Sequence, residues 1–212
     1  MADKATIDAV KDALAKSKER RFTESVEIAI NLKDVDLSQP KNRIDEEVVL
    51  PKGRGKSVKV AVIGTGEMVF KAKDVADIVI TPEQLGDYAG KKKDARKLVS
   101  SYNFFVAEAP LMPAIGKSLG TVMGPRGKMP KPIPPGADPA PVVENMRKTV
   151  KIRTRDRMTF HVPIGTRQMS PEDLAENIDA VVRRVIARLE RGRQSISSAY
   201  VKTTMGSAVR IL

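Results

Sequence analysis

The 212-residue sequence contains no cysteine, no tryptophan and a single histidine. The absence of cysteine excludes disulfide bonds, and a zinc site built on cysteine or on paired histidines cannot form. We therefore expect no metal and no other cofactor. A reducing, cytoplasmic location is compatible with this composition and is the expected one.

Long apolar runs are also missing. No segment approaches the ~18 to 20 consecutive apolar residues of a membrane-spanning helix. Aromatic residues make up only 4% of the chain, and membrane-surface helices favour Trp and Phe as anchors. The N-terminal residues MADKA turn polar at once, so no secretion signal is expected. The sequence predicts no membrane partner.

Positive charge, in contrast, is abundant. Lys and Arg total 38 against 26 Asp and Glu, which gives a net charge of +12 and a pI near 9.9. Solubility alone requires far less net charge. The excess favours a polyanionic partner, and nucleic acid in particular.

The two ends of the chain have the patterns of an antiparallel α+β domain. Apolar residues recur at helical spacing from Thr6 to about Lys18, and they alternate with polar residues from Val26 to Leu32. These patterns predict a helix followed by a half-buried strand. Further on, we expect strands at 48–50, 158–164 and 198–211, and a long helix that Ser170 caps and Gly192 ends.

The middle of the chain has a different pattern. Residues 58–63 are nearly all apolar, which is typical of a parallel strand covered on both faces. Further strands are predicted at 78–80 and 104–107, and helices at 68–76, 95–100, 112–119 and 139–149. Strands alternating with helices predict a Rossmann-like unit.

The predicted fold class is therefore α/β, with two domains. The first is a discontinuous α+β domain over 1–56 and 154–212, with an antiparallel split β-α-β sheet. The second is a three-layer Rossmann-like α/β domain inserted over 57–153. A hinge is expected at 53–56 and 151–154, where the sequence changes between antiparallel and parallel strand patterns.

Three features raise the alternative of a small nucleotide-binding enzyme. The strings PKGRGKS (51–57) and GKS (116–118) end like a phosphate-binding P-loop, and Gly64-Thr65-Gly66 follows a buried strand as in dinucleotide-binding folds. Both P-loop strings lack the first glycine, and Val69 occupies the third glycine position of the dinucleotide motif. His161 has no nucleophile elbow to accompany it. We therefore expect no enzyme and no catalytic residues.

Two segments suit RNA better than catalysis. Residues 122–132 are rich in Gly and Pro, which predicts a stiff loop that carries Arg126, Lys128 and Lys131 toward phosphates. An ordinary exposed loop is the alternative. Residues 200–207 (YVKTTMGS) place hydroxyls, a lysine and a glycine where they could reach RNA sugars, although alternating Thr and Val is common in any strand.

Four strings together resemble a known family: RFTESVE (21–27), LPKGRGK (50–56), GPRGKMP (124–130) and TTMG (203–206). In this order, and over essentially the full length, they resemble the family of large ribosomal subunit protein one, the universal lateral stalk family, and its archaeal branch in particular.

The resemblance implies a structural constituent of the large ribosomal subunit that binds stalk-region rRNA. It also implies a part in releasing deacylated tRNA from the exit site, repression of translation through binding the protein's own mRNA, ribosome association in the cytoplasm, and a monomer when free. An RNA-binding regulator that never enters ribosomes is the alternative, because rRNA and mRNA would share one surface.

The family's RNA contacts fall here on residues near both chain ends: Arg21, Phe22, Thr23, Glu24, Ser25, Ser198, Thr204, Met205 and Gly206. Secondary RNA contacts are expected at Lys52, Arg54, Lys56, Arg126 and Lys128. This chain departs from its relatives at Ser207, where they usually have proline.

Overall fold

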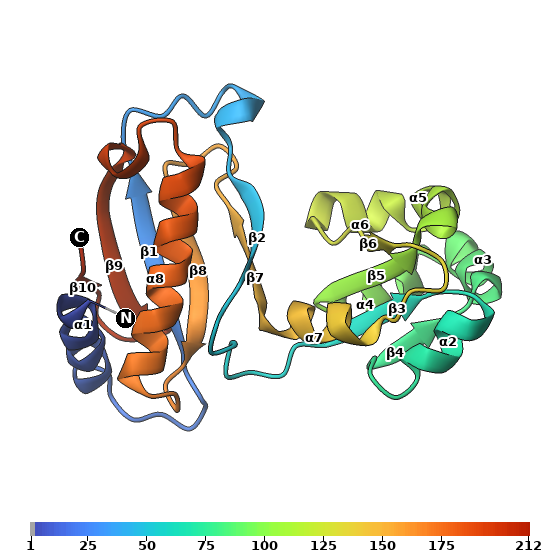
Figure 1. Ribbon diagram of the computed structural model, residues 1–212, viewed down its shortest axis with the longest axis horizontal. Coiled ribbons are helices and arrows are strands. Elements are labelled where there is room, and N and C mark those ends of the chain that lie inside the picture. The colour runs from blue at the N-terminus through green and yellow to red at the C-terminus, as the bar shows by residue number, and fades with distance from the viewer. Residues whose placement is uncertain (1–2) are drawn as a thin grey trace. The chain divides into compact units, whose positions relative to one another are not determined.

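The computed structural model describes residues 3–212, apart from the side chain of Ala89, and the chain divides into two compact units (Figure 1). Unit 1 combines Met1–Lys56 with Lys148–Leu212, and unit 2 is the inserted Ser57–Arg147. The second boundary lies before residue 148, not after 153 as the sequence indicated. The reason is that β7 (Thr149–Arg153) pairs antiparallel with β2 (Asp45–Val49), a strand of unit 1.

Unit 1 is built on a four-stranded antiparallel sheet. Its strand order is β10-β9-β1-β8, with bounds Val209–Arg210, Ile196–Thr203, Ser25–Leu32 and Thr159–Thr166. Along β1, half-buried residues alternate with buried ones, as the sequence predicts for a strand with one covered face. Val26, Ile28 and Ile30 point into the core of this unit.

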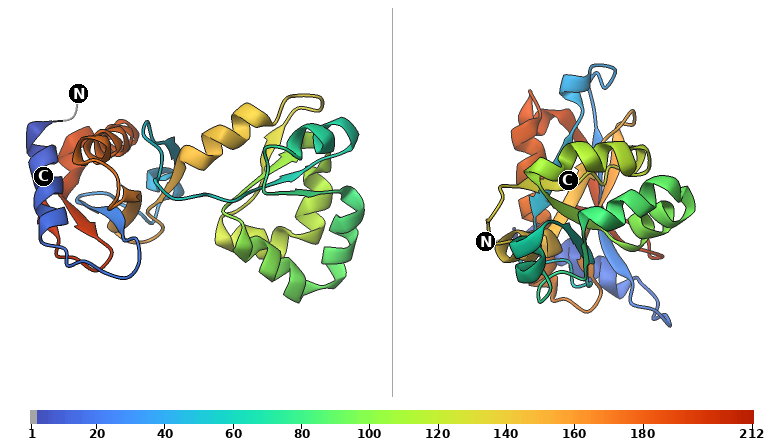
Figure 2. Two further views of the ribbon diagram at one scale, coloured as in Figure 1. Left: turned by 90° about the horizontal axis from the view of Figure 1, so that it is seen from below. Right: turned by 90° about the vertical axis from the view of Figure 1, so that its right-hand side faces the viewer.

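Two helices cover the inner face of this sheet. Helix α1 (Lys4–Ala15) contributes Val10 and α8 (Pro171–Arg188) contributes Ile178 to the same core as the inward residues of β1. Ser170 caps α8, because its Oγ accepts a hydrogen bond of 3.1 Å from the Asp173 N–H. In the described part of unit 1 no helix covers the outer face of the sheet (Figure 2).

Unit 2 has a parallel four-stranded sheet in the order β4-β3-β5-β6, with bounds Ile78–Ile80, Val60–Ile63, Phe104–Glu108 and Lys131–Ile133. One face is covered by α2 (Gly66–Ala72) and α7 (Ala140–Lys148). The other is covered by α3 (Pro82–Gly90), α4 (Lys92–Ser101), α5 (Met112–Ser118) and α6 (Gly120–Arg126), as Figure 2 shows. All four residues of β3 are buried, as a strand covered on both faces requires. The predicted α/β fold class is confirmed.

Four predictions of local structure were wrong. The segment expected to be a loop contains α6 and β6, because Pro125 lies in the last turn of the helix and Gly127, at φ 64°, ends it in the left-handed region. Helix α3 was missed, although Thr81, Pro82 and Gln84 are typical of a helix start. The final strand is two strands joined by a turn, and α8 ends at Arg188, before Gly192.

Candidate nucleic-acid interface

The predicted RNA contacts near the two chain ends meet at one end of the unit 1 sheet. Val26 of β1 pairs with Thr203 of β9, so the segment before β1 lies beside the turn after β9. The Thr204 N–H donates to the Ser25 carbonyl at 2.9 Å, and the Ser25 N–H donates to Thr204 Oγ1 at 3.1 Å. Residues 21–25 and 203–206 therefore form one continuous surface, which we call the terminal interface.

Glu24 connects the two halves of the terminal interface from beneath. Its side chain is only 1% exposed. One carboxylate oxygen accepts a hydrogen bond from Ser17 Oγ at 2.7 Å, and the other accepts one from the Met205 N–H at 3.0 Å. The hydrogen bond from Ser17, together with that from Met205 and the charges of Arg20 and Arg167, lowers the pKa of Glu24. Glu24 is thus a charged positioning group, and its buried side chain is not available as an RNA contact.

Arg167 was not among the residues that the sequence analysis identified. It lies in the loop between β8 and α8, and its guanidinium donates to the carbonyls of Ser17 and Lys18 at 3.2 and 2.9 Å. Its Nη1 also lies 3.7 Å from the Glu24 carboxylate. Sequence alone gave no signal for this role, because every partner comes from the far end of the chain.

The remaining predicted residues of the terminal interface face solvent. Arg21, Phe22 and Thr23 are exposed on one segment, and Thr204 and Met205 on the other. The Phe22 side chain is 53% exposed and that of Met205 is 60% exposed. Exposed apolar side chains next to cations can stack on RNA bases while the cations bind phosphates.

Gly206 is required where the turn passes over Ser17. A Cβ at this position would clash with Thr203 Oγ1 and would lie 3.4 Å from the Ser17 Cβ. Its N–H donates to the Thr203 carbonyl at 3.2 Å, which closes the turn. The glycine therefore allows the Met205 segment to lie close to the segment that contains Glu24.

Ser198 lies apart from the terminal interface, at the other end of β9. It pairs with Asn31, and its Oγ accepts a hydrogen bond of 2.8 Å from Asn31 Nδ2. Between Ser198 and the terminal interface, the outer face of the sheet carries Tyr200 and Lys202, from the segment 200–207 that the sequence indicated, and adds His161 to them. Tyr200 pairs with Ala29, which also pairs with His161, and Lys202 pairs with Glu27. The alternation of apolar and polar residues along β9 could have indicated this outer face from the sequence.

The expected secondary contacts differ in their environments. Lys52 Nζ forms ion pairs of 3.2 Å with Asp173 and 3.6 Å with Glu176, and its hydrogen bond to Asp173 is the main cause of its raised pKa. Arg54 is half-buried, and burial lowers its pKa. Lys56 is exposed, and Arg126, also exposed, lies at the end of α6.

Lys128 has a structural role that the sequence did not indicate. Its Nζ donates hydrogen bonds of 2.7 Å to the Val99 carbonyl and 2.6 Å to the Tyr102 carbonyl, at the C-terminal end of α4. A cation there also interacts favourably with the helix dipole. Burial lowers the pKa of Lys128, so its ammonium is committed to holding α4 against the segment after α6.

The three motifs considered for nucleotide binding lie at the ends of helices and strands. The string 51–57 leads into β3 and not into a helix, and the string 116–118 ends α5 instead of opening a helix. Gly64-Thr65-Gly66 leads into α2, with Thr65 as its N-cap. Thr65 Oγ1 donates a hydrogen bond of 2.7 Å to the Glu108 carboxylate. Among the described residues no group of three His, Asp or Glu could hold a metal ion. No helix within residues 3–212 is long and apolar enough to cross a membrane.

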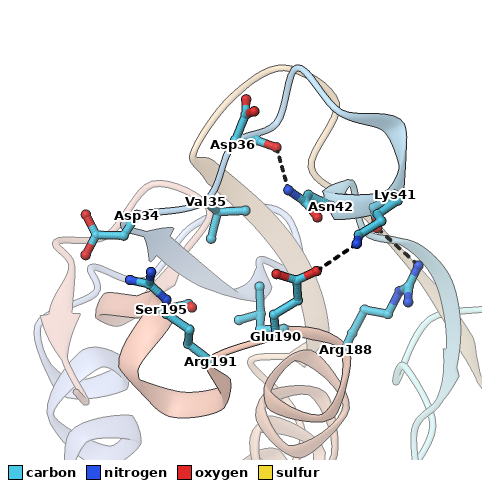
Figure 3. A pocket seen from close by; sticks show the side chains of 10 residues that line it. Asp34, Val35, Asp36, Lys41, Asn42, Arg188, Glu190, Arg191 and Ser195 are labelled. Atoms are coloured by element: carbon cyan, nitrogen blue, oxygen red, sulfur yellow. Dashed lines mark hydrogen bonds and ion pairs between the residues drawn. The ribbon is translucent and has the colours of Figure 1, made fainter.

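A polar hollow lies at the opposite end of β1 and contains none of the predicted RNA contacts (Figure 3). Carboxylates and cations line it together: Asp34, Asp36, Glu190, Lys41, Arg188 and Arg191. Lys41 and Glu190 form an ion pair of 3.3 Å across it. Because its charges are mixed, this hollow offers a polyanion little net attraction.

Comparison with known proteins matches one family over nearly the whole chain. The model of the Ribosomal protein L1p/L10e family matches residues 14–207. The chain belongs to this family. The resemblance stated from the motifs is thereby confirmed.

Relatives from archaea are similar over nearly their full length. Proteins named large ribosomal subunit protein uL1 are 53% identical over 213 aligned residues in Methanocella arvoryzae (100% of both chains) and 57% identical over 203 in Thermoplasma acidophilum (96% of this chain and 94% of the relative). A third, from Pyrococcus horikoshii, is 52% identical over 206 residues (97% and 94%). Because this family is structural, the prediction of a non-enzymatic protein is also confirmed.

Proposed function

We propose that this chain is a structural constituent of the large ribosomal subunit and that unit 1 binds stalk-region rRNA through the terminal interface. The single observation that carries the proposal is the buried Glu24. Its hydrogen bonds to Ser17 and Met205 hold two segments from opposite chain ends in one surface. A carboxylate buried at 1% exposure is costly unless it is fully partnered, which favours a role in shaping a binding surface.

The chemistry of the terminal interface suits RNA. Phe22 and Met205 offer apolar surface for bases, and Arg21 lies next to Phe22 on the exposed segment. The hydroxyls of Thr23 and Thr204 can bind the 2′-OH groups that distinguish RNA from DNA. The outer face of the sheet, with Tyr200 and His161, extends this surface toward Ser198.

Two finer functions belong to the same proposal. Bound at the stalk, the protein takes part in releasing deacylated tRNA from the exit site. Free of the ribosome, it binds a site in its own mRNA and represses translation. Because one surface serves both RNAs, a stalk rRNA fragment should displace an mRNA leader fragment stoichiometrically. Simultaneous binding of both fragments would contradict a shared surface.

The test compares wild type with a Phe22→Ala, Met205→Ala variant on a stalk rRNA fragment and an unrelated RNA hairpin. Both side chains are exposed, so the fold should be unaffected. Stacking on one base contributes ~1–3 kcal/mol by alanine substitution. We therefore expect the variant to lose at least about tenfold in affinity for the stalk fragment, and much less for the hairpin.

The matched control is Met158→Ala, which removes another exposed methionine of unit 1, 41% exposed and just before β8. It should bind the stalk fragment like wild type. If wild type binds both RNAs equally and the variant is unchanged, charge alone attracts RNA and the proposed site is wrong. Co-sedimentation with large subunits separates this proposal from a regulator that never enters ribosomes, which would stay in the supernatant.

A further inference from the structure

Helix α4 of unit 2 carries an unusually basic surface. The ten-residue helix has four cations and a single carboxylate, Asp94. All four cations are exposed, while Ala95, Leu98 and Val99 are buried against the unit 2 core. Arg126 at the end of α6 shares a shallow hollow with two of them. We call Lys92, Lys93, Arg96, Lys97 and Arg126 the α4 basic surface.

The cations of the α4 basic surface form no ion pairs in the described part of the chain. Among the described residues of unit 2, ion pairs join Lys71 to Glu67 and Arg147 to Asp77. No ion pair within residues 3–212 involves a member of the α4 basic surface. Five cations stand here against the single carboxylate of Asp94, which leaves a net positive charge at one place.

These cations occupy positions that destabilise the helix. Lys91 is the N-cap residue of α4 and makes no side-chain cap, and Lys92 and Lys93 follow at the positive end of the helix dipole. Lys92 with Arg96, and Lys93 with Lys97, also place two positive charges at i,i+4 spacing, which destabilises a helix. An arrangement that breaks these local rules without an internal partner is typical of a functional surface.

The geometry points to the phosphate backbone of RNA as the partner. We propose that the α4 basic surface forms a second RNA contact of the protein, independent of sequence and separate from the terminal interface. Lysine and arginine side chains suit phosphates, and Lys93 and Lys97 line the adjoining hollow. The hydroxyls of Ser100 and Ser101 donate within α4, to the Arg96 and Lys97 carbonyls at 2.7 and 2.9 Å, so the cations carry the proposed contact. A lipid surface fits less well, because every apolar residue of α4 is buried and none can insert into a membrane. This inference rests on the proposed function as an RNA-binding protein.

The test is a Lys92→Gln, Lys93→Gln, Arg96→Gln variant of the full chain. Glutamine keeps the helix propensity, and removing cations from the N-terminal turn should leave the melting temperature unchanged or raise it. The probe is an unrelated RNA duplex, titrated over a salt series. Each phosphate contact contributes about 0.7–0.9 to the slope of log K against log salt, so we expect the slope to fall by about 2 and the affinity at low salt by about tenfold.

The matched control is Lys59→Gln, Lys73→Gln, Lys117→Gln, which removes the same charge from unit 2 outside α4 and α6, again from cations for which the described residues show no ion pair. Its slope should fall by less than ~1. Equal losses in the two variants would overturn the inference, because net charge would then explain the whole effect. An α4 variant that binds RNA normally but no longer co-sediments with phosphatidylserine vesicles would also overturn it and assign the surface to lipid.

The two proposals fail separately. The α4 variant should keep the preference for the stalk fragment over the duplex, whereas the Phe22→Ala, Met205→Ala variant should lose it. If wild type shows no such preference, the proposed rRNA site is wrong. The α4 proposal would still hold in that case, provided that the α4 variant loses more salt dependence than its control.

Discussion

Replacing Glu24 with Gln should weaken the terminal interface without removing any exposed contact residue. Gln fills nearly the same space, but the neutral amide loses the charge that strengthens the hydrogen bonds from Ser17 and Met205. Hydrogen bonds to charged groups contribute ~1.5–3 kcal/mol, against ~0.5–1.5 for neutral pairs. With two bonds affected, the free energy of unfolding at pH 7 should fall by about 1–3 kcal/mol.

The pH dependence gives this prediction a defined sign. The hydrogen bond from Ser17 is the main reason that the pKa of Glu24 lies below its usual 4.5 in the folded protein. A lowered folded pKa means that Glu24 stabilises the fold fully above its unfolded pKa, and that this stabilisation is lost as pH falls through the folded pKa. The stability gap between wild type and Glu24→Gln should therefore be full at pH 7 and should close at acidic pH.

The assay is urea unfolding followed by circular dichroism from pH 7 down to pH 3, combined with binding to the stalk fragment at pH 7. Glu19→Gln is the matched control, because Glu19 is exposed and lines a hollow of the terminal interface together with Phe22 and Glu24. We expect Glu24→Gln to bind the fragment about tenfold more weakly, or ~1.4 kcal/mol, and the control to bind like wild type. A stability gap that does not change with pH, or unchanged RNA affinity in Glu24→Gln, would refute this reasoning.

Three further substitutions test single contacts by urea unfolding. Gly206→Ala should lower the free energy of unfolding by ~1–3 kcal/mol through overpacking, whereas Gly86→Ala, in open space on α3, should be neutral or stabilising; equal effects would contradict the close packing of the turn. Lys128→Met should cost about 1–2 kcal/mol by freeing two carbonyls of α4, and a loss of RNA affinity without a loss of stability would contradict its structural role. Asn177→Ala should cost about 2–4 kcal/mol, because this fully buried side chain donates to the Gly53 and Ile164 carbonyls; a cost below ~0.5 kcal/mol would show that water replaces these bonds.

Strong periodicity made much of the fold predictable from the sequence. The alternation in β1, the continuous apolar run of β3 and the amphipathic pattern of α8 each reflect burial on a defined face. Helix α6 was missed because Gly and Pro disfavour helices locally. Burial of Met123 in the unit 2 core and the left-handed Gly127 allow the helix to form despite them.

The terminal interface was only partly predictable, for a topological reason. Strings of residues indicated Arg21 to Ser25 and Thr204 to Gly206 as separate segments. The register of β1 against β9 brings them together, across 181 positions between Glu24 and Met205. Whether Glu24 faced RNA or the protein interior depended on that register, so the sequence could not reveal its positioning role.

Hydrogen exchange of the free and RNA-bound protein tests the central claim most directly. Amides of residues 21–25 and 203–206 should become strongly protected when a stalk rRNA fragment binds, together with the strands that form the outer face of the sheet. Protection confined to unit 2, with residues 203–206 exchanging as in the free protein, would contradict the assignment of the rRNA site to the terminal interface.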